Sequence, residues 1–279
     1  RPSNFWAMYW HTGDEKYARE GCLQFADWVR KNPHDAPHAE AWRSIEAGLR
    51  GCTWTELFQR FLDSPSFTPE VLVLFLDCIE EHGRFLRATY SEKSNWGLIE
   101  AQGLAFTAMT FPEFKDAEGW RKEAIRRLVR EIDNQVYADG HQRELSLDYH
   151  IGCISWVLRA HELAALNGKR QEFPANYLKK LERMPEAVMK LSHPDGTQTQ
   201  FGDGWAGGPG KTFSSLKRFA APFGRQDFLW VATDGKEGTK PVGTAFALEQ
   251  SGLYSFRSGW DRNAVCLVLK CGPAGGWPA

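Results

Sequence analysis

Residues 120–136 read WRKEAIRRLVREIDNQV, and their spacing decides the fold class of most of the chain. Apolar residues recur every three or four positions, which is the period of one face of an α-helix. This apolar stripe consists of Trp120, Ala124, Ile125, Leu128, Val129, Ile132 and Val136. The opposite face carries Arg121, Lys122, Arg126, Arg127 and Arg130. We interpret the basic face as a solvated surface rather than a binding patch, and we predict a helix that packs its apolar stripe against other helices.

The same period continues on both sides of this segment up to about residue 192. A helix over 71–85 follows Pro69, and proline favours the first turn of a helix. Further helices are predicted over 15–30, 39–49, 54–62, 98–109, 151–166 and 177–191, with a short one over 213–220. Polar or Pro/Gly-bearing connections separate them. The sequence therefore predicts a repeated helix-loop-helix arrangement.

The pattern changes near Phe228. The segments FLWVA (228–232), TAFALEQSGLYSFRSG (244–259) and AVCLVLKCG (264–272) are rich in β-branched and aromatic residues and are separated by turn residues, which is typical of strands. We predict a mainly α fold, with a helical domain over 1–224 and the start of an antiparallel sheet domain over 225–279. A sheet needs three or more strands and a covered face. These strands therefore either pack on the helical part or have partners outside this sequence.

Length and composition limit the classes of function. A chain of 279 residues suits one large domain or a domain and a half. The net charge of -1 provides no overall field that would attract nucleic acid or an anionic membrane. No apolar run approaches the ~18 residues of a membrane span. The six cysteines form neither a CxxC motif nor a zinc-type cluster, and most are predicted to be buried thiols, with no bridge required between Cys266 and Cys271. We expect no nucleic-acid or membrane partner.

The loop FGDGWAGGPGKT (201–212) ends like a phosphate-binding loop. A Walker A loop reads G-x-x-x-x-G-K-[ST], but Trp205 stands where its first glycine is required. The preceding residues also lack the buried strand that feeds such a loop. We instead expect the glycines to allow a sharp turn, with Asp203 accepting sugar hydroxyls and Trp205 offering a stacking face. Lys211 is expected to open the next helix.

Two other polar segments lie at helix junctions. SEKSNWGLIEAQG (91–103) contains Asn95 just before an apolar helix. ADGHQRELSLDYHIG (138–152) contains His141, Arg143, Glu144, Tyr149 and His150. Each segment also has a purely structural interpretation. Ser94 and Asn95 suit a helix cap, Tyr149 suits a core position, and His150 suits a buried histidine with satisfied hydrogen bonds.

Four segments together resemble a known family. SNWGLIEAQGLAFTAMTFPEF (94–114), NQVYADGHQRELSLDYH (134–150), HPDGTQTQFGDGWAG (193–207) and SGLYSFRSGWDRNAVCLVLKCGP (251–273) are similar, in this order, to the heparinase II/III polysaccharide lyases. The resemblance is clearest from about Trp42 onward. It implies an incomplete (α/α) toroid of helical hairpins followed by an antiparallel β-sandwich, with a sugar cleft between them. This agrees with the helices and strands read independently from the residue pattern.

The resemblance also implies a chemistry. Such lyases cleave uronic-acid polysaccharides by β-elimination, so the implied partner is an anionic polysaccharide or oligosaccharide. Asn95 matches the position that neutralises the uronate carboxylate, and Tyr149 matches the catalytic tyrosine. The candidates for substrate binding are Trp96, His141, Arg143, Glu144, His150, Asp203 and Trp205. Heparinase II-like members carry histidine at this position, whereas members of the heparinase III type carry asparagine. Asn95 therefore resembles the heparinase III type and favours a glucuronate-containing polymer.

A phenol with an ordinary pKa of about 10 needs a cationic neighbour to act as a base near neutral pH, whereas as an acid it can protonate a leaving oxygen. Arg143, His141 and His150 are the candidates for this cation, and the sequence does not choose among them. For His150 we also keep open a role in supporting Tyr149.

The family pattern continues beyond this sequence. The resemblance implies a further catalytic histidine and a His/Asp metal site shortly after the GPxGG segment, whereas the sequence given ends at Ala279. We therefore expect a piece of a longer enzyme, whose partner is the remaining C-terminal part of the same enzyme. We expect no cofactor or metal in this piece, and a periplasmic or secreted location.

Two other functions remain open. A glycoside hydrolase on a similar toroid would use two carboxylates, for which Glu100, Glu144, Asp148 and Asp203 are the candidates. The other is a non-catalytic carbohydrate-binding protein.

Overall fold

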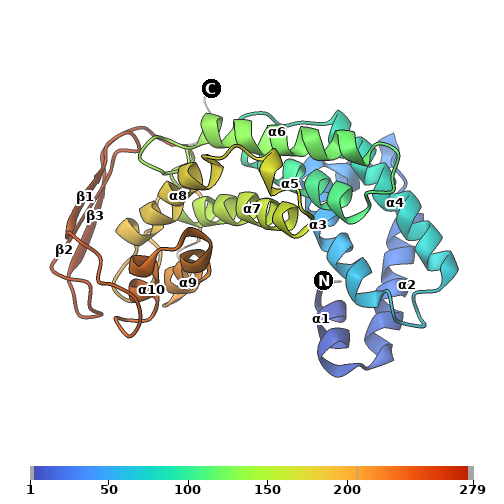
Figure 1. Cartoon of the computed structure of the whole chain (residues 1–279), viewed down its shortest axis with the longest axis horizontal. Coiled ribbons are helices and arrows are strands. Elements are labelled where there is room, and N and C mark those ends of the chain that lie inside the picture. The colour runs from blue at the N-terminus through green and yellow to red at the C-terminus, as the bar shows by residue number, and fades with distance from the viewer. Residues whose placement is uncertain (1–2, 206, 276–279) are drawn as a thin grey trace. The chain divides into compact units, whose positions relative to one another are not determined.

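The computed structural model describes residues 3–205 and 207–275 (Figure 1). They form two compact units. The first comprises residues 3–128 and 159–172, and the second comprises 129–158 and 173–275 apart from residue 206. The helices α6 (Ala117–Gln135) and α7 (Leu147–Leu166) each contribute residues to both units.

The first unit is helical. Its other elements are α1 (Ser3–Thr12), α2 (Glu15–Lys31), the 3₁₀ helix η1 (Ala36–Trp42), α3 (Ser44–Phe61), α4 (Pro69–Ala88), α5 (Asn95–Thr110) and the 3₁₀ helix η2 (Arg170–Glu172). Helix α3 packs against α1, α4 and α5. Aromatic side chains fill much of the core between these helices, including Phe25, Trp54, Phe61 and Phe75, which are all buried.

Helices α3 and α5 approach each other backbone to backbone. A Cβ atom on Gly48 would lie 2.7 Å from the carbonyl oxygen of Ile99, and one on Gly51 would lie 2.9 Å from the carbonyl oxygen of Gly103. A Cβ atom on Gly103 would clash with the carbonyl oxygen of Gly48. Three glycines therefore make room for the closest helix pair of this unit.

Most predicted helices are confirmed, several to within a few residues. The exception is the pair predicted over 39–49 and 54–62, which is wrong. The structure has η1 followed by one continuous α3. The glycines Gly48 and Gly51 lie inside this helix and serve the contact with α5. The sequence pattern also did not predict α1.

The second unit adds a small sheet to its helices. Its elements are α8 (Tyr177–Leu191), α9 (Lys211–Phe223), α10 (Gln226–Ala232), β1 (Ala245–Leu248), β2 (Leu253–Arg257) and β3 (Cys266–Lys270). Figure 1 shows α9 and α10 side by side, and the strands, at the red end of the colour scale, beside α8.

The strand predicted over 228–232 is wrong, because these residues belong to α10. Phe228 and Val231, three positions apart, are the buried residues of this helix. That spacing suits one face of a helix, but a five-residue apolar run does not distinguish a buried helix from a strand. Lys211 opens α9 as predicted.

The predicted antiparallel strands are confirmed at β1, β2 and β3. Their order is β1-β2-β3, and the register pairs Leu248 with Leu253 and Arg257 with Cys266. The buried hydroxyl of Ser255 donates a hydrogen bond to the carbonyl oxygen of Lys190 on α8, at 2.7 Å. The predicted domain boundary between residues 224 and 225 stays a prediction, and residues 276–279 of the predicted sheet domain lie outside the described residues.

All six cysteines are free thiols, including Cys266 and Cys271, for which the sequence left a bridge open. Four are buried, Cys266 is half-buried and Cys271 is exposed. Among the described residues, none of the helices combines the length and the apolar character needed to cross a bilayer.

Candidate active site

Tyr149 and Asp203 form the centre of the candidate site in the second unit. The Tyr149 hydroxyl, on the first turn of α7, donates a hydrogen bond to Oδ2 of Asp203 at 2.9 Å. This hydrogen bond, followed by partial burial and by the negative charges of Asp203, Glu144 and Asp148, raises the pKa of Tyr149. The phenol is therefore protonated at neutral pH. The structure thus brings together two residues that the sequence placed in separate segments.

The loop that carries Asp203 lies directly against the start of α7. A Cβ atom on Gly204 would clash with Oγ of Ser146, so the backbone of the loop approaches α7 closely. The Gln198 side chain donates a hydrogen bond to the carbonyl oxygen of Trp205 at 3.0 Å. The indole of Trp205 is 81% exposed. Its stacking role stays a prediction, and so does acceptance of sugar hydroxyls by Asp203, one oxygen of which already accepts from the phenol.

His141 and His150 stack on each other, with ring centroids 4.5 Å apart and planes 14° apart. Both side chains are buried. Nδ1 of His150 accepts a hydrogen bond from the Gln142 amide at 3.1 Å, so its Nε2–H donates to the carbonyl oxygen of Met184 at 2.9 Å. These contacts hold the turn before α7 against α8.

Burial lowers the pKa of His141 to about 4 and that of His150 well below its ordinary value. Both rings are neutral at pH 7, so neither supplies the positive charge that was expected near Tyr149. Their burial supports a positioning role, and their direct contact with substrate stays a prediction.

Arg143 and Glu144 lie in the segment between His141 and the start of α7. The side chain of Gln142 donates to Oε1 of Glu144 at 3.1 Å, and the Glu144 amide donates back to Oε1 of Gln142 at 2.9 Å. The half-buried side chain of Arg143 forms no hydrogen bond or ion pair with the described residues. Of the three candidate cations that the sequence named, Arg143 is therefore the one whose side chain is not engaged by another described residue.

The chain enters α7 through a strained residue. Leu145 is buried and has φ of 56°, a left-handed conformation that is rare for a bulky side chain. Lys93, in the segment before Asn95, has φ of 61°. Such strain persists only where surrounding structure enforces it, and it concentrates at functional sites. Leu145 and Lys93 lie in segments that the sequence singled out, whereas Asp234, with φ of 56°, lies outside them.

Asn95 begins α5 in the first unit. Ser94 is the helix cap, because its Oγ accepts a hydrogen bond from the Trp96 amide at 3.1 Å. The capping interpretation therefore holds for Ser94. Oδ1 of Asn95 is buried and has no hydrogen-bond partner among the described residues. An unsatisfied buried amide oxygen in a native structure needs an explanation, and a functional role is one.

Trp96 follows Asn95 and is 37% exposed. The guanidinium of Arg43 lies over its ring, 5.9 Å from the ring centroid. A partly exposed indole beside a cation suits an anionic sugar, and the predicted substrate contact of Trp96 stays a prediction.

A buried carboxylate holds the loop before Asn95. Glu100 is fully buried and accepts two hydrogen bonds from Ser91, from the amide at 2.8 Å and from the hydroxyl at 2.6 Å. A carboxylate in this position cannot reach a sugar in solution. The structure therefore removes Glu100 from the candidates for a hydrolase pair, and it shows a positioning residue that the sequence did not identify as one.

Arg127 corrects the prediction of a solvated basic face on α6. Its side chain is 3% exposed. The guanidinium donates to the carbonyl oxygens of Leu86 at 2.7 Å, Arg87 at 2.7 Å and Thr89 at 2.9 Å, and to Oε1 of Glu123 at 2.8 Å. Arg127 thus caps the C-terminus of α4, immediately before the loop that leads to Asn95. In the sequence, the position of Arg127 next to the apolar stripe of α6 could have indicated that its side chain is buried.

The predicted site residues divide between the two units. Asn95 and Trp96 belong to the first unit, and the others belong to the second. Within the second unit the structure joins Tyr149 to Asp203 and stacks His141 on His150. Joint action of Asn95 and Tyr149 on one substrate stays a prediction.

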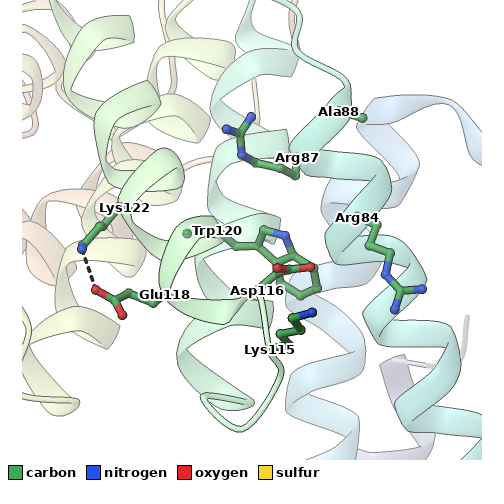
Figure 2. Close-up of a pocket in the computed structure, with 9 residues that line it drawn as sticks. Arg84, Arg87, Ala88, Lys115, Asp116, Glu118, Trp120 and Lys122 are labelled. Carbon is green, nitrogen blue, oxygen red and sulfur yellow. Dashed lines mark ion pairs between the residues drawn. The ribbon is translucent and has the colours of Figure 1, made fainter.

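A cavity of about 710 Å³ lies elsewhere in the first unit, between α4 and the start of α6 (Figure 2). Charged side chains surround it, and Figure 2 shows Lys122 paired with Glu118, at 2.5 Å. No predicted site residue lines this cavity, so its volume alone does not make it the active site. Within the described residues, no three or more His, Cys, Asp or Glu side chains are grouped as a metal site requires.

Residues 3–230 match the family model of the heparinase II/III N-terminus. The chain belongs to this family. It is 40% identical over 272 residues to a heparin-sulfate lyase of Pedobacter heparinus, covering 96% of this chain and 41% of that protein. It is also 37% identical to a heparin-sulfate lyase of Bacteroides stercoris, covering 95% of this chain and 43% of that protein.

A solved structure supports the fold. The crystal structure titled heparinase III has a TM-score of 0.86 with this chain at 26% identity, covering 95% of this chain and 43% of that one. The predicted fold class, a mainly helical toroid followed by the start of an antiparallel sheet domain, is confirmed. The chain spans about two fifths of the length of the relatives that it matches.

Proposed function

We propose that this heparinase II/III family chain is the helical part of a polysaccharide lyase that cleaves a glucuronate-containing, heparan-sulfate-like polymer by β-elimination. The observation that carries the proposal is the phenol of Tyr149, protonated and hydrogen-bonded to Asp203 at a loop that also exposes Trp205. The names of the relatives support this choice of substrate class.

The reaction requires two proton movements. A base removes the C5 proton of the uronate, the C5–H electrons form the C4=C5 double bond, and the bond between C4 and the glycosidic oxygen breaks. The departing oxygen then needs a proton. Because the raised pKa keeps Tyr149 protonated, we assign the phenol to this step as the general acid. Asp203 holds the hydroxyl in place until the substrate oxygen accepts from it.

Asn95 is assigned to the uronate carboxylate. Removing the C5 proton builds negative charge next to a group that is already charged, so a donor to the carboxylate lowers the barrier. The side-chain amide can donate through its nitrogen. Oδ1 of Asn95 lacks a partner in the described structure, so the amide is not committed to a competing protein contact through that atom.

The base must be a different group. A phenol that donates to a carboxylate is a poor base near pH 7, and the rings of His141 and His150 are buried and already hydrogen-bonded. We therefore assign removal of the C5 proton to the further catalytic histidine that the family resemblance implies beyond this sequence. The same proposal includes a periplasmic or secreted location, where an extracellular anionic polymer can be reached.

The test uses the protein encoded by the complete gene. We expect heparan sulfate to yield unsaturated products, measured by their ultraviolet absorbance. Tyr149→Phe and Asn95→Ala are each expected to lower kcat at least about 100-fold, since each removes a proton donor that acts in the transition state. Circular dichroism should show unchanged helix content. Tyr17→Phe, which alters a tyrosine of α2, is the matched control and should retain full activity.

Other outcomes would support the competing functions. Saturated ends alone would indicate a glycoside hydrolase. Binding of heparan sulfate without turnover, unaffected by Tyr149→Phe, would indicate a carbohydrate-binding protein. Either result would end the lyase proposal.

A further inference from the structure

A second cavity of the first unit lies between α2 and α3, outside every segment assigned above. Its volume is about 780 Å³, which is within the range of small-molecule sites. Its lining includes Gln24, Trp28, Lys31, Arg50 and Trp54. Both polar donors and aromatic rings therefore line one cavity.

Arg50 is held in a cage of three tryptophans. Its guanidinium carbon lies 4.5 Å from the ring centroid of Trp28, 5.5 Å from that of Trp42 and 5.6 Å from that of Trp54. Cation–π attraction to the rings stabilises the positive charge of the guanidinium. It does not occupy the N–H groups of the guanidinium as hydrogen bonds would. The cage therefore fixes the orientation of Arg50 and leaves its donors for other partners.

Among the residues that the structure describes, only a neutral group accepts a hydrogen bond from the Arg50 side chain. Nε of Arg50 donates to Nε2 of His82 at 2.9 Å, and Nδ1–H of His82 donates to the carbonyl oxygen of Cys78 at 2.8 Å. His82 is fully buried, and burial lowers its pKa to about 3. It thus remains a neutral acceptor and adds no negative charge beside Arg50.

The guanidinium of Arg50 feels the negative charge of Glu46, but it forms no direct ion pair with a carboxylate of the described residues. Among the described residues it has no ion pair, and its Nη2 is buried without a hydrogen-bond partner. Glu46, the carboxylate nearest in sequence on α3, pairs with Arg43. Burial lowers the pKa of Arg50 to about 10, although the negative charge of Glu46 acts in the opposite direction, so Arg50 remains charged at pH 7.

Two other arginines of this chain, Arg127 and Arg225, show the usual arrangement, whereas Arg257 donates to a backbone carbonyl and lies over Trp260. Arg127 pairs with Glu123. Arg225 pairs with Glu182, Glu186 and Asp227. Buried charges in proteins are normally paired in this way, because an unpaired charge is costly to remove from water. Arg50 departs from that rule where a cavity adjoins it.

We propose that this cavity is an anion-binding site that takes a carboxylate or sulfate group of a small ligand on the guanidinium of Arg50. Carboxylate and sulfate oxygens accept charge-assisted N–H bonds from a guanidinium, and these bonds are stronger than those to a neutral ligand. Lys31 adds a second cation, although it pairs with Asp27 at 2.9 Å. The site is separate from the lyase proposal, because binding can be measured without turnover.

Calorimetric titration of the full chain with sodium sulfate, sodium glucuronate and glucose tests the site at constant low ionic strength. We expect saturable binding of one or both anions and none of glucose. Binding of glucuronate would identify the carboxylate of a sugar acid as the ligand group, and binding of sulfate alone would identify a sulfate group. Arg50→Gln should weaken binding at least about tenfold, because a charge-assisted bond is lost.

Two further variants complete the test. Asp27→Asn removes a negative charge from the cavity lining and leaves the tryptophan cage intact, so it should tighten binding by about threefold. Arg87→Gln removes an exposed arginine from the cavity of Figure 2 and should leave the affinity unchanged.

Several results would overturn the proposal. One is the absence of saturable binding of either anion. Another is an affinity of Arg50→Gln equal to that of the unaltered chain. The third is a loss of affinity in Arg87→Gln as large as that in Arg50→Gln. If Arg50→Gln does not fold, Asp27→Asn decides, because an unchanged affinity in that variant would show that the anion does not bind in this cavity.

Discussion

At the scale of single residues, Asp203 sets the ionisation of the Tyr149 phenol. The hydrogen bond and the charge of Asp203 raise the pKa of Tyr149, so the bond is present at ordinary pH and is lost as pH rises through the raised value. We expect Asp203→Asn to lower this pKa. Ultraviolet titration of tyrosinate should show one tyrosine moving to lower pH in Asp203→Asn, and Tyr149→Phe should remove that same transition. An unchanged titration in Asp203→Asn would show that the hydrogen bond does not persist in solution.

The sequence named Tyr149 and Asp203, but it could not join them. They are 54 positions apart, and their contact depends on how the loop before α9 packs on α7. For His141 and His150 the sequence suggested a positive charge that the folded structure does not have. A histidine beside a catalytic tyrosine suggests a source of charge, whereas the protonation state depends on burial, which local sequence does not give.

At the scale of helices, the contact between α3 and α5 depends on Gly103. Gly103→Ala places a methyl group against the backbone of Gly48, which cannot move aside as a flexible side chain can. We expect it to lower the free energy of unfolding by about 1–3 kcal/mol. Chemical denaturation measures this difference.

Gly119→Ala on α6 is the matched control. A Cβ atom there would meet nothing within 4 Å, so the higher helix propensity of alanine should raise the free energy of unfolding by up to about 1 kcal/mol. If both variants changed the free energy of unfolding equally, the close backbone contact between α3 and α5 would not be what determines the effect of an added methyl group.

Helix positions were the most predictable feature, because amphipathic spacing fixes a helix through its own residues. Tyr177–Leu191 has the predicted bounds. The failures have a common cause. The glycines of α3 and the apolar run of α10 are locally ambiguous, and only their packing partners decide the structure that they adopt.

At the scale of the whole molecule, three fully or nearly fully buried histidines make the free energy of unfolding depend on pH in the acidic range. The folded pKa of His82 is about 3 and that of His141 about 4, and that of His150 is also depressed, all below the unfolded value near 6.5. Below pH 6.5 the unfolded chain therefore binds protons that the folded chain excludes, and stability falls as pH falls. At pH 5 each such histidine should cost about 2 kcal/mol of the free energy of unfolding.

Urea denaturation at pH 7 and pH 5 measures this loss. His141→Gln should reduce the difference between the free energies of unfolding at pH 7 and pH 5. His11→Gln, at an exposed position of α1, should leave that difference unchanged. A pH dependence that is the same in His141→Gln as in the unaltered chain would mean that this ring is protonated in the folded state.

The cap that Arg127 provides also has a consequence for the synthesis of the chain. The three carbonyl oxygens that it binds lie 38 to 41 residues earlier. When a ribosome has completed α4 and the loop to Asn95, the residue that caps that helix has not yet been made. The end of α4 therefore acquires its native hydrogen bonds only after α6 has been synthesised and has docked, so the loop that presents Asn95 reaches its final form after the helices on both sides of it are complete.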